Sequence, residues 1–270
     1  AYHVAKIFSE TFGFEPIAVG LTTADHGVFN YSTLFPLITI EKLAAEITLD
    51  DVLIANPSFS AHHFGLSLPG RKLMYVQGFN TFSLLDCRFD HYVAVSHVVQ
   101  RLLAGVYDIQ APIIPAFIND IGGIEAPDWM QRRKGSIVAS PKLPQVYLNH
   151  LQHCLNEQGC KVELSYLPTD KIPQTELMRI IGQHQFFLSL SPAEGFGLMP
   201  LEAMAMGTVV VGFDGFGGRD FMRSGENCLV VPYCEIERLA ALIGSAMNDM
   251  TVGQRLSDAS RITAQKPEFH

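Results

Sequence analysis

The sequence predicts an α/β protein made of two successive units that contain parallel sheets. Short apolar runs alternate with helical stretches along most of the chain, which is the pattern of consecutive βα units. These runs are nearly continuous in valine, isoleucine and leucine, as strands buried on both faces are. The stretch 119–135 is rich in glycine, proline and mixed charge, and we interpret it as the linker between the units.

The first unit opens with an amphipathic helical pattern at 2–13. A strand and turn that would normally introduce such a helix have no match in the sequence, so we expect the first unit to lack its initial strand. The remaining predicted strands are 16–22, 51–59, 72–79, 91–96 and 111–118, and the remaining predicted helices are 40–47 and 97–105.

The alternation restarts after the linker. The predicted strands of the second unit are 135–140, 161–167, 186–191, 208–213 and 227–232, and its helices are 146–159, 174–184, 200–206, 218–225 and 237–250. Pro200 suits the first helical position, where its missing N–H is no loss, and Gly207 suits the position just past a helix end. The resulting domains are 1–120 and 134–255, with a tail or helix at 256–270.

Composition narrows the class of protein. The chain has 270 residues, 48% of them hydrophobic and 17% charged, which is typical of a soluble globular protein with ample core. Its net charge of −8 argues against nucleic acid as a partner. The only dense basic run, 132–134, is interpreted as solvated linker. Five cysteines without CxxC spacing predict reduced thiols, and with no apolar run of membrane-span length they favour the cytoplasm.

A glycine-rich turn at 194–197 carries the functional prediction. Glu194 and Glu202 have seven residues between them, and Gly-Phe-Gly directly follows the first acid. Such a turn before a helix offers unpaired N–H groups and the positive end of the helix dipole to a phosphate. Glu202 suits paired hydroxyls such as a ribose diol, and Glu194 a polyhydroxylated group beyond the phosphates. On spacing alone, a tight turn and a helix-dipole role for Glu202 are equally good readings.

The string PAEGFGLMPLEAMAMGTVVVGFDGFGGRD resembles the donor site of retaining glycosyltransferases of the family 4 type. The resemblance is strong over roughly 180–235 and weaker from about 50 to 180. It implies two Rossmann-like domains facing a cleft (the GT-B fold), the acceptor bound by the first and the donor by the second. The matching positions are Glu194, Gly195, Phe196, Gly197, Pro200, Glu202, Ala203, Met204 and Gly207, with Gly217 and Gly218 downstream.

The resemblance also implies roles for single residues. Glu194 would contact the transferred sugar and Glu202 the ribose, while Phe196, Gly197 and Leu198 would offer backbone contacts. The family neutralises the diphosphate with an arginine and a lysine. Here only Lys142 fits, and Arg219 is the candidate for the missing charge.

The first unit offers weaker candidates. His62 and His63 follow a predicted buried strand, where some family members carry a histidine that faces the reacting sugar. Histidines at strand ends are more often structural. Gln77 and Ser96 are candidates to line the cleft, with core or capping roles equally open.

We therefore predict a glycosyltransferase that moves a sugar from a nucleotide-sugar to a glycan, lipid or small-molecule acceptor with retention of configuration. No cofactor or metal is expected, because the nucleotide-sugar is a substrate and the histidines show no metal-binding spacing. The alternative is a nucleotide-sugar-binding or scaffolding subunit with reduced catalysis, which the missing strand and arginine favour. Peripheral membrane contact and the oligomeric state are left open.

Overall fold

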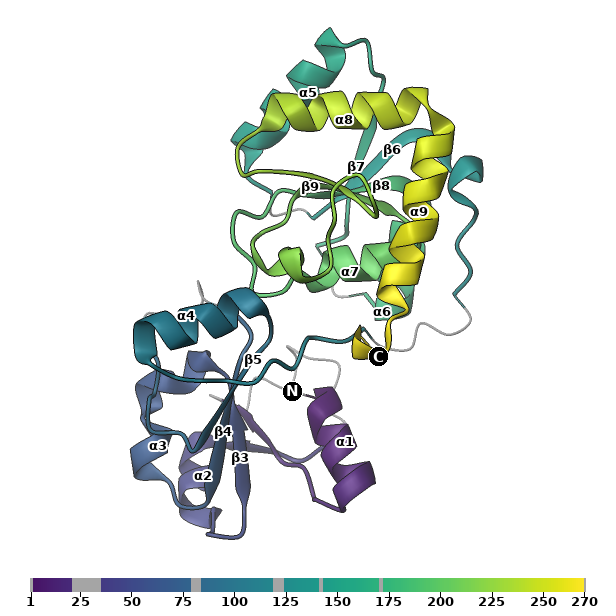
Figure 1. Cartoon of the computed structure of the whole chain (residues 1–270). Coiled ribbons are helices and arrows are strands. Elements are labelled where there is room, and N and C mark those ends of the chain that lie inside the picture. Colours follow the sequence, from purple (N-terminus) through teal and green to yellow (C-terminus); the bar gives the residue numbers. More distant parts are fainter. Residues whose placement is uncertain are drawn as a thin grey trace. The chain divides into compact units, whose positions relative to one another are not determined.

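The computed structural model describes residues 2–20, 35–78, 84–118, 124–140, 143–169 and 172–269 (Figure 1). The chain divides into two compact units. Unit 1 comprises residues 1–75 and 82–92, and unit 2 comprises residues 76–81 and 93–270.

Unit 1 consists of short strands and helices in α/β alternation. Its elements are α1 (Tyr2–Phe12), β1 (Ala18–Gly20), β2 (Leu37–Thr39), α2 (Ile40–Glu46), β3 (Val52–Ala55), η2 (Pro57–His62), α3 (Phe64–Ser67) and β4 (Arg71–Val76). β1 pairs with β2 and β3 with β4, both in parallel. Sequence patterns did not predict β2, which is only three residues long.

A third strand, β5 (His91–Ala94), completes a sheet of order β3-β4-β5, and α4 (His97–Tyr107) follows it. The prediction of a further strand at 111–118 was wrong. In that segment Ile113 forms a single isolated bridge with Ala94. Pro112 and Pro115 carry no N–H group, so the segment cannot form a regular ladder.

Unit 2 contains a five-stranded parallel sheet of order β10-β9-β8-β6-β7. Its strands are β6 (Arg133–Ala139), β7 (Glu163–Tyr166), β8 (His184–Ser189), β9 (Val209–Phe213) and β10 (Leu229–Val231). Its helices are α5 (Gln145–Glu157), α6 (Gln174–Gly182), α7 (Leu198–Ala205), α8 (Ile236–Asn248) and α9 (Met250–Ala264), with short 3-10 turns η3 (Trp129–Gln131), η4 (Gly217–Asp220) and η5 (Pro267–Phe269).

Both faces of this sheet are buried, as the continuous apolar runs predict. Ile137 and Ala139 of β6 belong to the core cluster that also takes in α5 and α8, and Val138 between them is fully buried on the opposite face. Figure 1 shows α5 and α8 on one side of the sheet and α6 and α7 on the other. The two helical layers hold the carboxyl ends of the strands in place.

The interpretation of 119–135 as a linker was wrong at its carboxyl end, and the basic run 132–134 is solvated only at Arg133 and Lys134. The Trp129 side chain is fully buried and packs edge-on against Phe186, with ring centroids 5.7 Å apart. Arg132 is also buried, and its guanidinium donates to the backbone oxygen of Met206 at 2.7 Å. Burial lowers the pKa of Arg132 to about 10. This end of the segment is therefore part of unit 2.

The helix after the glycine-rich turn begins two residues earlier than predicted. α7 starts at Leu198, so Pro200 is its third residue and not its first. The proline remains in the first turn, where N–H groups have no partner within the helix. The predicted end is confirmed, because Gly207 follows the C-cap residue Met206 with a φ of +65°.

Candidate active site

The strand order of unit 2 places the predicted donor turn where ligands bind in open α/β sheets. The chain passes from β6 to β7 on one side and then returns to β8 on the other side of β6. The carboxyl ends of β6 and β8 therefore form a topological switch point, which is the usual ligand position in this kind of sheet. The turn at 190–197 follows β8 directly.

Backbone hydrogen bonds join this turn to the loop after β9. The Glu194 N–H donates to the Gly215 oxygen at 2.7 Å, and the Gly217 N–H donates to the Glu194 oxygen at 3.1 Å. A Cβ at Gly217 would lie 2.5 Å from the Gly195 carbonyl, so the loops can approach this closely only with glycine there. The exposed Glu194 side chain thus projects from a backbone held on both sides.

Phe216 forms a strained turn beside Glu194. Its φ of 67° and ψ of −48° place it at the centre of a γ-turn, which the Gly217 N–H closes on the Gly215 oxygen at 2.9 Å. Asp214 Oδ1 supports the turn by accepting the Phe216 N–H at 2.8 Å. A non-glycine residue in such a conformation costs about 1–3 kcal/mol, and such residues cluster at functional sites.

Two segments from the first half of the chain that belong to unit 2 contact the same turn. The buried Ser96 Oγ donates to the Gly195 oxygen at 2.5 Å. A Cβ at Gly195 would lie 2.0 Å from the Gln77 oxygen, so no other residue fits at position 195 without a shift of the backbone. Gln77 and Ser96, which the sequence offered as candidates to line the cleft, therefore both lie against this turn. Gln77 does so through its backbone and Ser96 through its hydroxyl.

The turn leads directly into the N-terminus of α7. Gly197, with a φ of +96°, is the N-cap residue and has no side chain with which to cap the helix. Leu198, the first helical residue, is exposed, whereas Phe196 is buried against Phe221 and Phe269, with ring centroids 5.2 and 6.0 Å away. This aromatic packing fixes the position of the turn. The first N–H groups of α7 are suited to an anion.

Glu202 is almost fully buried in α7, with 5% of its surface exposed. Its Oε1 accepts a hydrogen bond from Gln174 Nε2 at 2.6 Å. Burial raises the pKa of Glu202 to about 7, and the Gln174 hydrogen bond acts in the opposite direction. A desolvated carboxylate with a raised pKa is costly for the fold, and such groups occur preferentially at functional sites.

The glycine pair and Arg219 lie in η4, beside the turn. A Cβ at Gly218 would lie 2.9 Å from Met222 Cε, so this glycine allows close packing. Arg219 is half-exposed and its Nε donates to Asp214 Oδ2 at 2.9 Å. The guanidinium also lies over the Phe216 ring, 4.7 Å from its centre. Arg219 is thus near the turn, but its charge is already engaged by Asp214.

The two histidine candidates belong to unit 1. The His62 ring stacks on Phe64, with ring centroids 5.3 Å apart, and both histidines are exposed. His63 adopts a left-handed conformation with a φ of 53°, joining η2 to α3. They follow β3, as the sequence indicates, and their catalytic role stays a prediction.

Lys142 lies outside the described residues, and its proposed phosphate contact stays a prediction. Across the described part of the chain, His, Cys, Asp and Glu side chains form no group of three suited to a metal ion. In the same residues, no helix has both the length and the apolar character that a membrane crossing requires. The five cysteines are all free thiols.

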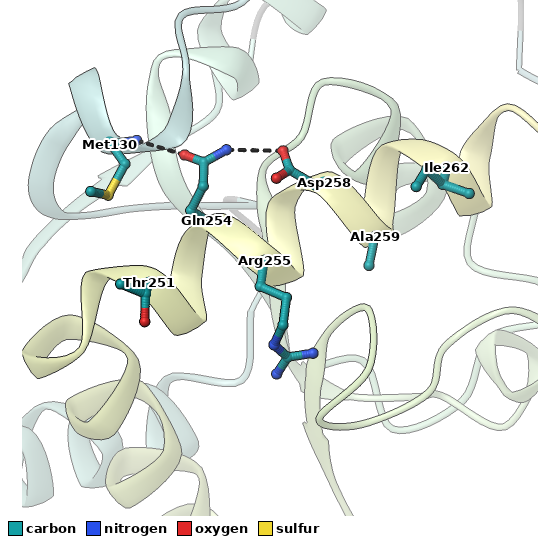
Figure 2. A pocket seen from close by; sticks show the side chains of 7 residues that line it. All are labelled: Met130, Thr251, Gln254, Arg255, Asp258, Ala259 and Ile262. Atoms are coloured by element: carbon teal, nitrogen blue, oxygen red, sulfur yellow. Dashed lines mark hydrogen bonds between the residues drawn. The ribbon is translucent and has the colours of Figure 1, made fainter.

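A separate groove of about 540 Å³ runs along α9, away from the residues predicted for the donor site. Figure 2 shows Gln254 at its centre, where Oε1 accepts the Met130 N–H at 3.3 Å and Nε2 donates to Asp258 at 2.9 Å. Ile262 adds an exposed apolar side chain at one end. Of the other polar side chains in the groove, Thr251 donates to Asp249 and Arg255 donates to the Gly225 oxygen, so the polar groups of the groove are already engaged within the protein.

Sequence reasoning missed three residues of this site: Gln174, Asp214 and Phe216. Gln174 is 28 positions from Glu202 and begins a different helix, so no local pattern connects them. Asp214 could have been noticed, because a polar residue directly after a buried strand lies at the ligand edge of a parallel sheet. The strain at Phe216 has no sequence signal, since glycine is the residue expected at positive φ.

Comparison with known proteins agrees with this geometry. A glycine-bearing turn at a switch point, followed by a helix N-terminus, is the arrangement of α/β proteins that bind phosphorylated ligands. Residues 159–263 match the family model of glycosyl transferases group 1. The resemblance drawn from the donor motif is confirmed at that level.

Curated relatives match short segments. The chain is 42% identical over 53 residues to a putative glycosyltransferase 41 of Sulfolobus islandicus filamentous virus, covering 20% of this chain and 16% of the relative. It is 36% identical over 80 residues to the poly(glycerol-phosphate) alpha-glucosyltransferase of Bacillus subtilis, covering 29% and 12%. The matched segments thus span only a small part of the relatives' own length.

Solved structures match over nearly the whole chain. Anabaena Alr3699/HepE in complex with UDP-glucose has a TM-score of 0.72 at 13% identity, covering 100% of this chain and 92% of that one. A glycosyltransferase from Rickettsia africae has a TM-score of 0.71 at 14% identity, covering 97% and 87%. At these identities the likeness shows the fold. It confirms an α/β fold with parallel sheets of the kind found in GT-B glycosyltransferases.

Proposed function

We propose that this chain is a glycosyltransferase that moves a sugar from a nucleoside-diphosphate sugar to an acceptor with retention of anomeric configuration. The Glu194 turn carries the proposal, because it leads directly into α7, the helix that holds the buried Glu202 carboxylate. The match of residues 159–263 to glycosyl transferases group 1 supports sugar transfer as the reaction class. The acceptor is a glycan, a lipid or a small molecule.

The chemistry proposed for the site is positioning and charge stabilisation. The diphosphate leaving group would lie at the first N–H groups of α7, where backbone dipoles stabilise developing negative charge without reorganisation. Lys142 would add a positive charge there, and Arg219 would do so if it left Asp214. Glu194 would hold the transferred sugar in the orientation required for attack on the same face, and Glu202 would accept the ribose hydroxyls.

UDP-sugars are the first donors to test. Alr3699/HepE was solved with UDP-glucose, and the pneumococcal O-GlcNAc transferase GtfA was solved with UDP and GlcNAc. These ligands belong to those proteins, and they support the same nucleotide for this chain. GDP-, ADP- and TDP-sugars complete the panel.

The Glu194→Ala variant tests the proposed role of the turn. Because the Glu194 backbone holds the turn and the carboxylate is exposed, the variant should keep its fold and its melting temperature. We expect loss of transfer and of donor hydrolysis by at least about 100-fold, the scale of removing one stabilising group. Release of the nucleoside diphosphate from a radiolabelled donor measures both reactions.

Glu157→Ala, at the exposed end of α5, is the matched control and should retain full turnover. Full turnover of Glu194→Ala would remove Glu194 from the site. Donor binding without turnover on any acceptor would instead support the binding or scaffolding subunit.

A further inference from the structure

The buried carboxylate of Glu202 is held by a hydrogen bond from the Gln174 side chain. Gln174 is the first residue of α6, and its Nε2 donates to Glu202 Oε1 at 2.6 Å. The bond joins two neighbouring helices on the same face of the sheet. An amide N–H bound to a carboxylate oxygen restricts the rotation of that carboxylate, because the acceptor must keep its lone pair toward the donor.

The surroundings of Glu202 make this contact important. Burial raises the pKa of Glu202 to about 7, and the Gln174 amide lowers it. At a buried position, a hydrogen bond to the charged form increases the fraction of carboxylate present at neutral pH.

We infer that Gln174 is a positioning residue of the donor site, whose amide fixes one oxygen of the Glu202 carboxylate so that the other faces the hydroxyl pair of the ligand. This inference rests on the proposed function, in which Glu202 accepts the ribose hydroxyls. Gln174 acts through Glu202 and needs no contact with the ligand.

The arrangement sets a pH dependence for nucleotide binding. Ligand hydroxyls donate to the ionised carboxylate, so affinity rises as the pH rises through the pKa of Glu202 and levels off above it. Without the Gln174 amide that pKa rises further, and the increase in affinity moves to higher pH. At neutral pH the dissociation constant should increase by about three- to tenfold, the scale of the net contribution of one ordinary hydrogen bond.

The test uses two variants and a matched control. Gln174→Ala removes the hydrogen-bond donor. Gln174→Glu keeps the size of the side chain but replaces its amide by a second carboxylate, which should move the pH midpoint of Glu202 ionisation further upward. Gln145→Ala is the control, because Gln145 also begins a helix directly after a proline and its amide bonds only an exposed side chain, Asn149. Circular dichroism verifies that each variant is folded.

Two readouts are measured on the whole chain. Carbon-13 NMR of glutamate-labelled protein follows the ionisation of Glu202 without ligand, and calorimetric titration with UDP follows binding between about pH 5.5 and 8.5, on both sides of the pKa. We expect both midpoints to move upward in Gln174→Ala and Gln174→Glu, and neither to move in Gln145→Ala.

The two proposals fail in different ways. An unchanged Glu202 titration and unchanged UDP affinity in folded Gln174→Ala would overturn the role of Gln174 and leave the proposed function intact. A wild-type protein that binds none of UDP, GDP, ADP and TDP would contradict the proposed function, and with it the donor-site role of Gln174.

Discussion

At the scale of single residues, Glu202 is the clearest case of a candidate site residue that lowers the stability of the fold. A helix this apolar gains nothing from a carboxylate buried to 5% exposure and bonded to one amide. The raised pKa is the measure of that cost, since a shift of one unit corresponds to about 1.4 kcal/mol. Glu202 is therefore kept at the expense of folding free energy, which is expected of a residue that serves a ligand.

Replacing Glu202 by glutamine should remove a pH dependence of stability. The folded pKa of about 7 lies above the ordinary value of 4.5 for a glutamate, so the folded state binds the proton more tightly than the unfolded state. Wild-type stability therefore falls as the pH rises between these two values and then levels off. Glutamine does not ionise. As the pH rises through this range, the unfolding free energy of Glu202→Gln should therefore increase relative to that of the wild type by up to about 3 kcal/mol.

Urea denaturation at about pH 4.5 and pH 8, at the lower end of this range and above it, measures most of this difference. Parallel stability profiles for the wild type and Glu202→Gln would show that Glu202 titrates in the folded protein as it does in the unfolded chain. Such a result would also remove the basis for the pH dependence of nucleotide binding.

At the scale of elements, the two turns after β8 and β9 act as one unit. The hydrogen bonds between Glu194, Gly215 and Gly217 make the position of the Glu194 carboxylate depend on a loop that follows a different strand. The γ-turn at Phe216 stores backbone strain at the same point. Precise placement of the carboxylate thus comes from the pairing of the turns, because neither is a regular element.

Gly217→Ala should separate the two turns. Its new Cβ would lie 2.5 Å from the Gly195 carbonyl and the Phe196 nitrogen, and backbone atoms cannot give way as a flexible side chain does. We expect a loss of about 1–3 kcal/mol in unfolding free energy, as for other overpacked sites, together with loss of donor turnover. Chemical denaturation and the donor-hydrolysis assay measure the two effects.

Gly105→Ala is the control for this substitution. Gly105 lies inside α4 with nothing within 4 Å of an added Cβ, so alanine should stabilise the helix by about 0.5–1 kcal/mol. Equal behaviour of the two variants would contradict the close contact between the turns.

At the scale of the whole molecule, Trp129 provides a probe of unit 2. It is the only tryptophan, and it is fully buried against Phe186. Its emission should therefore be shifted to short wavelength in the folded protein and report the unfolding of this unit. A ligand of the folded state raises the midpoint of that transition.

Addition of UDP should move the Trp129 transition toward higher temperature. At a concentration 100 times the dissociation constant, the expected gain in unfolding free energy is about 2.7 kcal/mol. The shift is measured by fluorescence during heating, with uridine as the control ligand that lacks the diphosphate. Equal shifts with UDP and uridine would show that the phosphates contribute no affinity, contrary to the site proposed at α7.

The sequence predicted the elements of unit 2 well, because each βα step has its own hydrophobic run and its own boundary residues. Gly207 marks the end of α7 from local chemistry alone, whereas the start at Leu198 depends on the conformation of Gly197 and was placed two residues late. Trp129 and Arg132 were misjudged for a related reason. Their segment is irregular locally and becomes core only through contacts with distant strands.

The sequence by itself determined the alternation of strands and helices, the turn between Glu194 and Gly197, and the match of residues 159–263 to the model of glycosyl transferases group 1, since all three depend on neighbouring residues. Only the tertiary structure decided the strand order that puts the turn at a switch point, the pairing of two turns, and the bond from Gln174 to Glu202. These features depend on hydrogen bonds and burial between residues that lie far apart in the chain. Local sequence patterns therefore cannot predict these features.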